Sequence, residues 1–163
     1  MNFGLVILTF NEIDGITKLW DEIPFNDFDE CFAVDGGSTD GTLEYFKKKS
    51  FKVNGQSKKG RGEAFRIAFA NSKSDILIFY SPDGNEDPKD IKSIKNEFIK
   101  NNNLDLVIAS RMMKGAFNEE DNQIFKFRKW ANNIFNFFAN LLFNKNFKDN
   151  YITDSINGFR GFH

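Results

Sequence analysis

The sequence contains little cysteine, little histidine and no excess of either charge. Its 163 residues include one cysteine and one histidine, and 22 Lys and Arg residues balance 23 Asp and Glu residues. The lone Cys31 excludes an internal disulfide and fits a reducing, cytoplasmic compartment. The lone His163 leaves no histidine-based triad or histidine-rich metal site. The balanced charge predicts no nucleic-acid partner.

Long hydrophobic runs are also absent. No stretch of about 18 apolar residues occurs, so the sequence predicts no membrane-spanning helix. The apolar residues 4–10 have no basic leader, and charge follows at Glu12 and Asp14, so they predict a first strand rather than a signal peptide. The length fits a single domain, which we predict to occupy residues 1–163.

Short apolar runs alternate with helical patterns along the chain. The runs, rich in β-branched residues, lie at 4–9, 31–34, 51–53, 76–80 and 104–109. Helices are predicted at 40–49, around 64–69 and from Pro88 onwards. Several strands are apolar throughout, as expected for strands covered on both faces. The sequence therefore predicts an α/β fold with a mainly parallel sheet and helices on both faces.

The segment 123–147 predicts a helix rich in phenylalanine with a wide apolar face. Its apolar residues include Trp130, Ile134, Phe137, Phe138, Leu141 and Leu142. Such a helix either packs on the sheet or lies at a membrane interface, because both environments favour the same pattern. The second interpretation predicts peripheral contact with the inner face of the membrane through residues 123–147.

Polar segments follow the predicted strands. They are Thr9–Glu12, Asp35–Thr42, Ser81–Pro88 and Ser110–Arg111. In an open parallel sheet the carboxyl ends of the strands meet at one edge, and ligands bind just beyond it. We therefore expect a ligand site at this edge.

Each polar segment also has a purely structural interpretation. Asn11 and Glu12 suit the beginning of a helix, and the glycine-rich residues after Asp35 suit a tight turn with a helix cap. Asp35, however, ends a buried strand, where a carboxylate is costly unless it meets a partner such as a base or a ribose hydroxyl. We therefore favour a binding role for Asp35.

Two further segments have the composition of a nucleotide-diphosphate site. Asp83, Glu86 and Asp87 gather oxygen ligands of the kind that Mg²⁺ or Mn²⁺ prefers. The segment 57–62 places three cations and two glycines before a predicted helix, which suits anion binding, although a surface loop with solvated lysines explains it equally well. The sequence contains neither a P-loop nor a complete dinucleotide fingerprint.

Taken in order, these segments resemble those of family 2 glycosyltransferases with the GT-A fold, in particular polyprenyl-phosphate sugar transferases. The similar segments are 5–12, 34–42, 59–64, 76–88, 109–111 and 154–160. The resemblance implies a Rossmann-like GT-A domain. It also implies transfer of a sugar, with inversion, from a nucleotide-diphosphate sugar to a polyprenyl phosphate or a glycan, in cell-envelope glycan biosynthesis. Family members normally continue beyond the last segment, so we expect a C-terminally truncated or a minimal domain.

The resemblance assigns the nucleoside to Glu12 and Asp35, and Mg²⁺ or Mn²⁺ to Asp83 with help from Asn85. Ser81 stands where the family has the first Asp of its metal motif, and a site with fewer carboxylates binds metal more weakly. A requirement for metal therefore stays open. The full set expected to bind the donor is Leu8, Phe10, Asn11, Glu12, Asp35, Gly37, Lys59, Gly60, Ser81, Pro82 and Asp83.

The resemblance also implies that Arg111 and Arg128 face phosphates, so that Asp83, Arg111 and Arg128 are the expected catalytic residues. If the acceptor is a hydroxyl, residues 119–121 contain candidates for the base that it needs, and none of them is assigned. An alternative function is a nucleotide-sugar-binding regulatory or scaffold protein that has lost catalysis. A sugar nucleotidyltransferase would need a glycine-rich loop after the first strand, where Thr9–Glu12 has none.

Overall fold

The computed structural model describes residues 1–113, 127–145 and 150–163, with side chains from residue 130 onwards in the second range. The chain divides into two compact units. One consists of residues 1–107 and 158–163, and the other of residues 108–157. The expectation of a single, truncated or minimal domain stays a prediction. Within the described residues, no helix is both long and apolar enough to cross a membrane.

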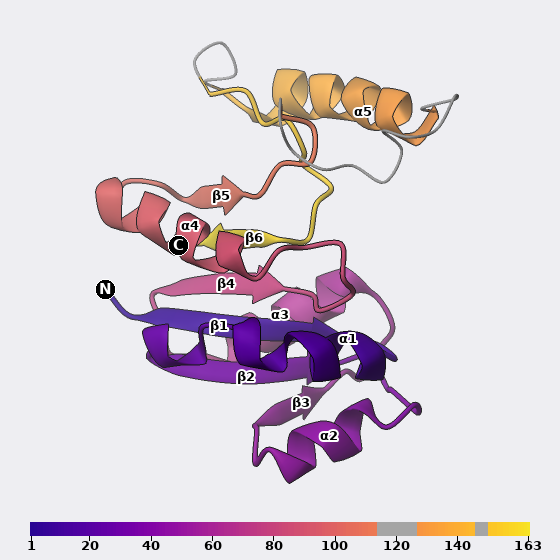
Figure 1. Ribbon diagram of the computed structural model, residues 1–163. Helices are drawn as coiled ribbons and strands as arrows, with labels where there is room; N and C mark the ends of the chain where they lie inside the picture. The colour runs from indigo at the N-terminus through magenta and orange to yellow at the C-terminus, as the bar shows by residue number, and fades with distance from the viewer. Residues whose placement is uncertain (114–126, 146–149) are drawn as a thin grey trace. The chain divides into compact units, whose positions relative to one another are not determined.

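The first unit is built on a six-stranded sheet with the strand order β3-β2-β1-β4-β6-β5 (Figure 1). The strands are β1 (Phe3–Thr9), β2 (Glu30–Asp35), β3 (Val53–Gly55), β4 (Ile76–Tyr80), β5 (Leu106–Ile108) and β6 (Arg160–Phe162). β1 pairs in parallel with β2 and β4, and β2 pairs in parallel with β3. β6 pairs antiparallel with β4. The structure confirms the predicted fold class, and it adds β6, which was not predicted.

Helices follow most of the strands. They are α1 (Ile13–Leu19), α2 (Thr42–Lys48), α3 (Arg61–Asn71) and α4 (Lys89–Lys100), with 3-10 turns at Trp20–Glu22 and Phe25–Asp27. α1 begins directly after Glu12, so the structural interpretation of Asn11 and Glu12 as a helix start is correct. Pro88, predicted as the first helical residue, is instead the N-cap of α4, so the helix begins one residue later than predicted, at Lys89.

The core fills both faces of the sheet, and Figure 1 shows α1 and α3 on opposite faces. All seven residues of β1 are buried. Alternate strand residues pack on α3 in a cluster of Val6, Leu8, Phe32, Val34, Ala64, Ile67, Ala68, Leu77 and Phe79. On the helices, Ile16 of α1 and Ile91, Ile94 and Phe98 of α4 are also buried. Strands that are covered on both faces explain the continuous apolar runs of the sequence.

The second unit contains α5 (Phe127–Phe143), which buries a stripe of asparagines. Asn132, Asn136 and Asn140 are at most 8% exposed. The amide of Asn140 donates to the backbone oxygen of Ile152 at 2.8 Å and accepts from the Ile152 N–H at 2.9 Å. The helix therefore holds the segment around 152–155 through a polar face.

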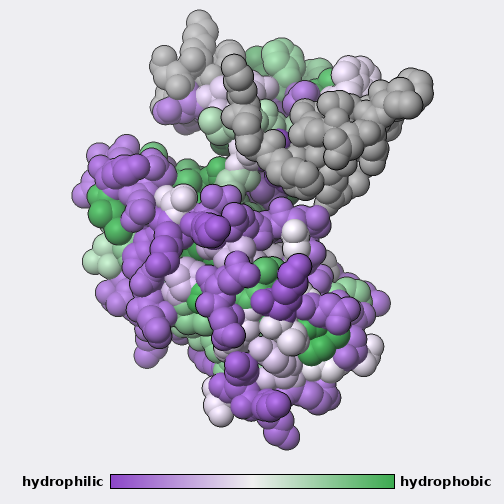
Figure 2. Space-filling model, in the orientation of Figure 1, coloured by the Kyte–Doolittle hydropathy of each residue, from purple (hydrophilic) through white to green (hydrophobic). Residues whose placement is uncertain are grey.

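The apolar side chains of α5 lie at the surface. Those of Trp130, Phe135, Phe137, Phe138, Leu141, Leu142 and Phe143 are more than half exposed. Figure 2 shows green, hydrophobic side chains of this helix at the molecular surface. Both interpretations of the apolar face, packing on the sheet and contact with a membrane, stay predictions.

Candidate functional site

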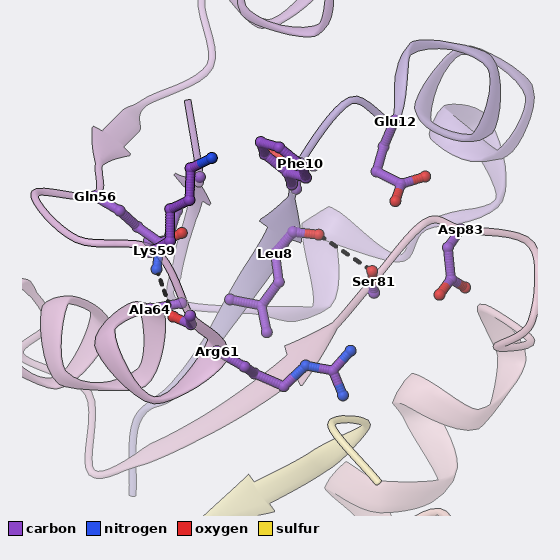
Figure 3. Close-up of a pocket in the computed structure, with 13 residues that line it drawn as sticks. Leu8, Phe10, Glu12, Gln56, Lys59, Arg61, Ala64, Ser81 and Asp83 are labelled. Carbon is purple, nitrogen blue, oxygen red and sulfur yellow. Dashed lines mark hydrogen bonds between the residues drawn. The ribbon is translucent and has the colours of Figure 1, made fainter. Parts of the chain in front are cut away.

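A cavity of about 320 Å³ lies at the carboxyl ends of β1, β2 and β4, beside the start of α3 (Figure 3). The register explains its position, because Thr9 of β1 pairs with Asp35 of β2 and Ile7 pairs with Tyr80 of β4. The three strands thus end side by side. The lining residues are Leu8, Thr9, Phe10, Glu12, Val34, Gly36, Gln56, Lys59, Gly60, Arg61, Ala64, Ser81 and Asp83.

The cavity brings together many of the residues expected to bind the donor. Those that line it are Leu8, Phe10, Glu12, Lys59, Gly60, Ser81 and Asp83. The expected residues Asn11, Gly37, Pro82 and Asn85, which belong to the surrounding turns, and Asp35, which ends β2, are not among the lining residues. The roles of all these residues in binding stay predictions.

Asp35 is buried and saturated by protein donors. One carboxylate oxygen accepts the N–H groups of Gly37 and Ser38, both at 2.8 Å. The other accepts the hydroxyls of Thr9 at 2.9 Å and Ser38 at 2.6 Å. A carboxylate offers about four acceptor sites, so these donors occupy them all. The partner that a buried carboxylate requires is supplied by the chain itself, which corrects our reason for assigning Asp35 to a base or a ribose.

Asn11 joins the first two strand ends. Its backbone φ is 58°, and its N–H donates to the Ser38 hydroxyl at 2.8 Å. Its side-chain oxygen accepts the Thr39 N–H at 2.9 Å. Asparagine tolerates the left-handed region better than most residues. Asn11 therefore fixes the turn that carries Phe10 and Glu12 into the cavity.

One side of the cavity is acidic. Figure 3 shows the carboxylates of Glu12 and Asp83 on the same side of the cavity. Partial burial raises the pKa of Glu12, and the charges of Asp83 and Asp40 raise it further. One oxygen of Asp83 accepts the backbone N–H of Asn85 at 3.0 Å. Two neighbouring carboxylates attract a cation, since their mutual repulsion falls when it binds.

The described residues contain no group of three or more Asp, Glu, His or Cys side chains able to hold a metal ion. Mg²⁺ is often held by one or two carboxylates together with phosphate oxygens and water, and Asp83 and Glu12 fit that arrangement. They do not fit a metal held by protein ligands alone. If a divalent cation binds here, it is expected to bind together with a phosphate ligand.

The other acidic residues after β4 have structural roles. The carboxylate of Glu86 accepts the Ser81 N–H at 2.8 Å, and Asp87 accepts the Lys89 N–H at 2.9 Å at the start of α4. The Ser81 hydroxyl donates to the Leu8 carbonyl oxygen at 3.3 Å. This contact gives a structural reason for serine at position 81, since an aspartate carboxylate there would face the same carbonyl without a proton to donate.

The opposite side of the cavity is basic. Lys59, Gly60 and Arg61 lead into α3, and Gly60 has a φ of 122°, which side chains rarely adopt. The amide of Gln56 donates to the Gly60 carbonyl at 2.8 Å and thereby braces the turn. Our assignment omitted Gln56 and Arg61. The three cations of segment 57–62 pointed to Arg61, whereas no pattern in the sequence pointed to Gln56.

Arg111, one of the expected catalytic residues, belongs to the second unit. Its guanidinium forms an ion pair with the buried Asp154, with 2.9 Å between Nε and the carboxylate. The side chain of Arg128 and the candidate bases at 119–121 lie outside the described residues. The roles of Arg111 and Arg128 toward phosphates stay predictions.

The family model of glycosyl transferase family 2 matches residues 5–162. The chain therefore belongs to glycosyl transferase family 2, and its class is that of the glycosyltransferases. No curated protein shows a significant match to the sequence. The family assignment confirms the general resemblance of the sequence segments.

Solved structures of glucosyl-3-phosphoglycerate synthase from Mycobacterium tuberculosis resemble the chain. The complex with uridine diphosphate has a TM-score of 0.73 at 18% identity, and so does the complex with Mn²⁺, uridine diphosphate and glucosyl-3-phosphoglycerate. The complex with Mn²⁺, uridine-diphosphate-glucose and phosphoglyceric acid has a TM-score of 0.72 at 18% identity. Each alignment covers 99% of this chain and 56% of the solved chain. At this identity the comparison supports the GT-A fold alone.

Proposed function

We propose that the chain transfers a sugar from a nucleotide-diphosphate sugar to an acceptor, with the donor bound in the cavity at the ends of β1, β2 and β4. The observation that carries this proposal is the division of charge in the cavity. Glu12 and Asp83 lie on one side, and Lys59 and Arg61 approach from the start of α3 (Figure 3). A diphosphate with a bound divalent metal ion matches this arrangement. The metal ion would face the two carboxylates, and the phosphate oxygens would face the lysine and arginine side chains.

The nucleoside is expected at the end of the cavity formed by Phe10, Gly36 and Gln56. The ring of Phe10 is 52% exposed, and it offers an apolar surface on which a base can stack. The Gln56 amide nitrogen is held by Gly60, so its oxygen is the group left to accept a hydrogen bond. Glu12 remains the expected ligand of the ribose or base, whereas Asp35 is expected to act through the turn that it holds.

In the proposed reaction the acceptor oxygen attacks the anomeric carbon as the nucleotide diphosphate leaves, with inversion. Lys59 and Arg61 stabilise the negative charge that develops on the leaving group, which is electrostatic catalysis. Asp83, assisted by Asn85, would hold Mg²⁺ or Mn²⁺ beside the negative charge of Glu12, and the cation would supply further neutralisation of the diphosphate. Several of the solved neighbours contain Mn²⁺ together with uridine diphosphate or uridine-diphosphate-glucose.

For the acceptor we propose a compound that carries a phosphate. The polyprenyl phosphate suggested by the sequence resemblance and the phosphoglyceric acid of the solved neighbour share this group. A lipid phosphate is already anionic and needs little help from a base, whereas a hydroxyl acceptor requires one. Transfer assays with a polyprenyl phosphate, with phosphoglyceric acid and with a glycan show which of the three compounds accepts the sugar.

The experiment is a titration of the purified chain with uridine and guanosine diphosphate sugars, with and without Mn²⁺, followed by transfer assays. We expect binding that Mn²⁺ strengthens, and we expect Asp83→Ala to remove the effect of Mn²⁺. Asp21→Ala, an exposed residue outside the cavity, is the matched control. Unchanged metal-dependent binding in Asp83→Ala would refute the metal assignment. Binding without transfer to any acceptor would favour the alternative, a nucleotide-sugar-binding regulatory or scaffold protein.

We also propose that α5 contacts the membrane surface on its cytoplasmic side. Its polar stripe is engaged by the chain's own residues 150–155, whereas Phe137, Phe138 and Leu142 are exposed. The sequence adds basic residues at both ends of the helix, including Lys129 and Lys145, which suit an anionic surface.

Sedimentation with vesicles of anionic phospholipid tests this contact. Changing Phe137, Phe138 and Leu142 together to serine is expected to abolish co-sedimentation, while Asn133→Ser on the same helix is expected to retain it. Equal co-sedimentation of both variants would contradict the proposal. A loss of thermal stability in the triple variant would show instead that this face packs within the protein.

A further inference from the structure

Arg61 lies against the backbone of Gly158 at the edge of the donor cavity. A Cβ atom added to Gly158 would lie 2.5 Å from Nη1, 2.8 Å from Cζ and 3.1 Å from Nε of Arg61. All three atoms belong to the planar guanidinium, so the group packs on the glycine with more than one of its atoms. The contact exists because residue 158 has no side chain.

Gly158 offers a firm support for this contact. It is buried, and the next residue, Phe159, is 2% exposed with its ring 5.5 Å from that of Tyr80. The strand that follows pairs with β4, whose last residue directly precedes Ser81. The support for Arg61 and the turn that carries Asp83 are therefore both attached to β4.

Arg61 has little else to fix its orientation. The residue is exposed, and within the described part of the chain its side chain has no hydrogen bond or ion pair. A free arginine side chain has considerable rotamer entropy, which is lost when it binds a ligand in a single orientation. Figure 3 shows the Arg61 side chain reaching from the start of α3 towards the side of the cavity where Ser81 and Asp83 lie. This is the direction in which a diphosphate would lie between the basic and acidic sides.

We propose that Gly158 is a positioning residue for the donor diphosphate, because its missing side chain leaves room for the guanidinium of Arg61 to point into the cavity. The inference rests on the proposed function. A larger residue at position 158 would displace the guanidinium and weaken its hydrogen bonds to the phosphates.

A substitution at Gly158 tests this contact without disturbing the rest of the fold. Gly158 is not among the glycines with positive φ, so alanine suits its backbone. The three atoms nearest to the added Cβ all belong to the flexible end of Arg61. Gly158→Ala is therefore expected to move Arg61 and to leave the fold intact. Gly55→Ala is the matched control, since a Cβ at that position would have no neighbour within 4 Å.

The experiment titrates each variant with uridine diphosphate and with uridine in the presence of Mn²⁺, and measures the melting temperature. In Gly158→Ala we expect about tenfold weaker binding of uridine diphosphate, the loss typical of a charge-assisted hydrogen bond, with unchanged binding of uridine. Arg61→Ala should show the same pattern. The double variant should bind uridine diphosphate no more weakly than Arg61→Ala does, because both substitutions remove the same interaction.

Equal affinity of Gly158→Ala and wild type for uridine diphosphate would overturn the inference, and so would an equal loss for uridine. If Gly158→Ala lowers the melting temperature, adding Arg61→Ala should restore it, and failure to do so would also overturn the inference. A wild-type chain that binds neither uridine nor guanosine diphosphate would instead refute the proposed function itself.

Discussion

The guanidinium of Arg111 donates two hydrogen bonds to the carboxylate of Asp154, at 2.9 and 3.2 Å. The backbone N–H of Arg111 donates a third at 3.2 Å. The Asp154 side chain is fully buried, whereas that of Arg111 is 40% exposed. Arg111 therefore compensates a buried charge, whatever further role it has towards a phosphate.

Removing Arg111 should destabilise the unit formed by residues 108–157. Arg111→Ala leaves the carboxylate of Asp154 buried without its cation, which typically costs about 3–5 kcal/mol. Arg111→Lys keeps the charge and should cost less. The fluorescence of Trp130, measured in a Trp20→Phe background during urea unfolding, reports on this unit. If Arg111→Ala unfolds at the same urea concentration as wild type, the ion pair contributes nothing to the stability of this unit.

The stability of the same unit should fall in acid. Burial raises the pKa of Asp154, but the hydrogen bonds from Arg111 and Asn132 outweigh it and hold the pKa below its ordinary value of 3.8. A lowered pKa contributes stability that is present above pH 3.8 and is lost as the pH falls through the lower value. Melting temperatures from pH 7 to pH 2 should therefore drop less in Asp154→Asn than in wild type. Parallel curves would contradict this assignment.

Glu12 should have the opposite effect on stability. Partial burial and the charges of Asp83 and Asp40 raise its pKa above 4.5, so its contribution is fully present below that pH and is lost as the pH rises through the raised value. At pH 7, Glu12→Gln should therefore have a higher melting temperature than wild type, and this difference should be smaller at pH 4. The same substitution should weaken nucleotide binding. Glu22→Gln, an exposed residue outside the cavity, should change neither.

Introducing an aspartate at position 36 should not improve the site. A Cβ at Gly36 would lie 2.9 Å from the Gln56 side-chain oxygen and 3.1 Å from the Phe10 ring. Gly36→Asp should therefore displace Phe10 and weaken binding of uridine diphosphate by severalfold in calorimetric titrations. Tighter binding would mean that Phe10 and Gln56 do not hold the base.

The asparagine stripe of α5 should be essential for the second unit. The Asn136 amide donates to the Thr153 carbonyl at 2.6 Å, and its oxygen accepts the Ser155 N–H at 2.9 Å. Asn136→Leu removes both hydrogen bonds and should cost at least about 2 kcal/mol in urea unfolding. The exposed neighbour Asn133, changed in the same way, should cost little. Similar losses of stability in both variants would contradict a special contribution of the buried asparagines.

The sheet could largely be predicted from the sequence. The apolar run 76–80 corresponds to β4, and β1 differs from its prediction by one residue. Buried strands carry their own signal in continuous hydrophobicity. β6 carries none, because Arg160–Phe162 is short and contains a charge and a glycine, and its place depends on pairing with β4. Such pairing is a tertiary effect that no local pattern contains.

The site was only partly predictable, for the same reason. The turns after β1, β2 and β4 were identified from their composition. The saturation of Asp35 by protein donors, however, depends on how Gly37 and Ser38 fold back onto it. The burial of the asparagine stripe of α5 could not be predicted either, since asparagines at a spacing of four residues ordinarily mark the solvent side of a helix. Here they bind backbone groups instead.

The position of β6 has a consequence for synthesis of the chain on the ribosome. Five strands precede it in sequence, yet it lies between β4 and β5. A nascent chain is able to pair its first four strands early, whereas the outer edge of the sheet waits for the residues that follow Asn157. Since Gly158 emerges with that segment, the residues that form β6 also complete the surroundings of Arg61, and a chain that ends before them would have an unfinished sheet.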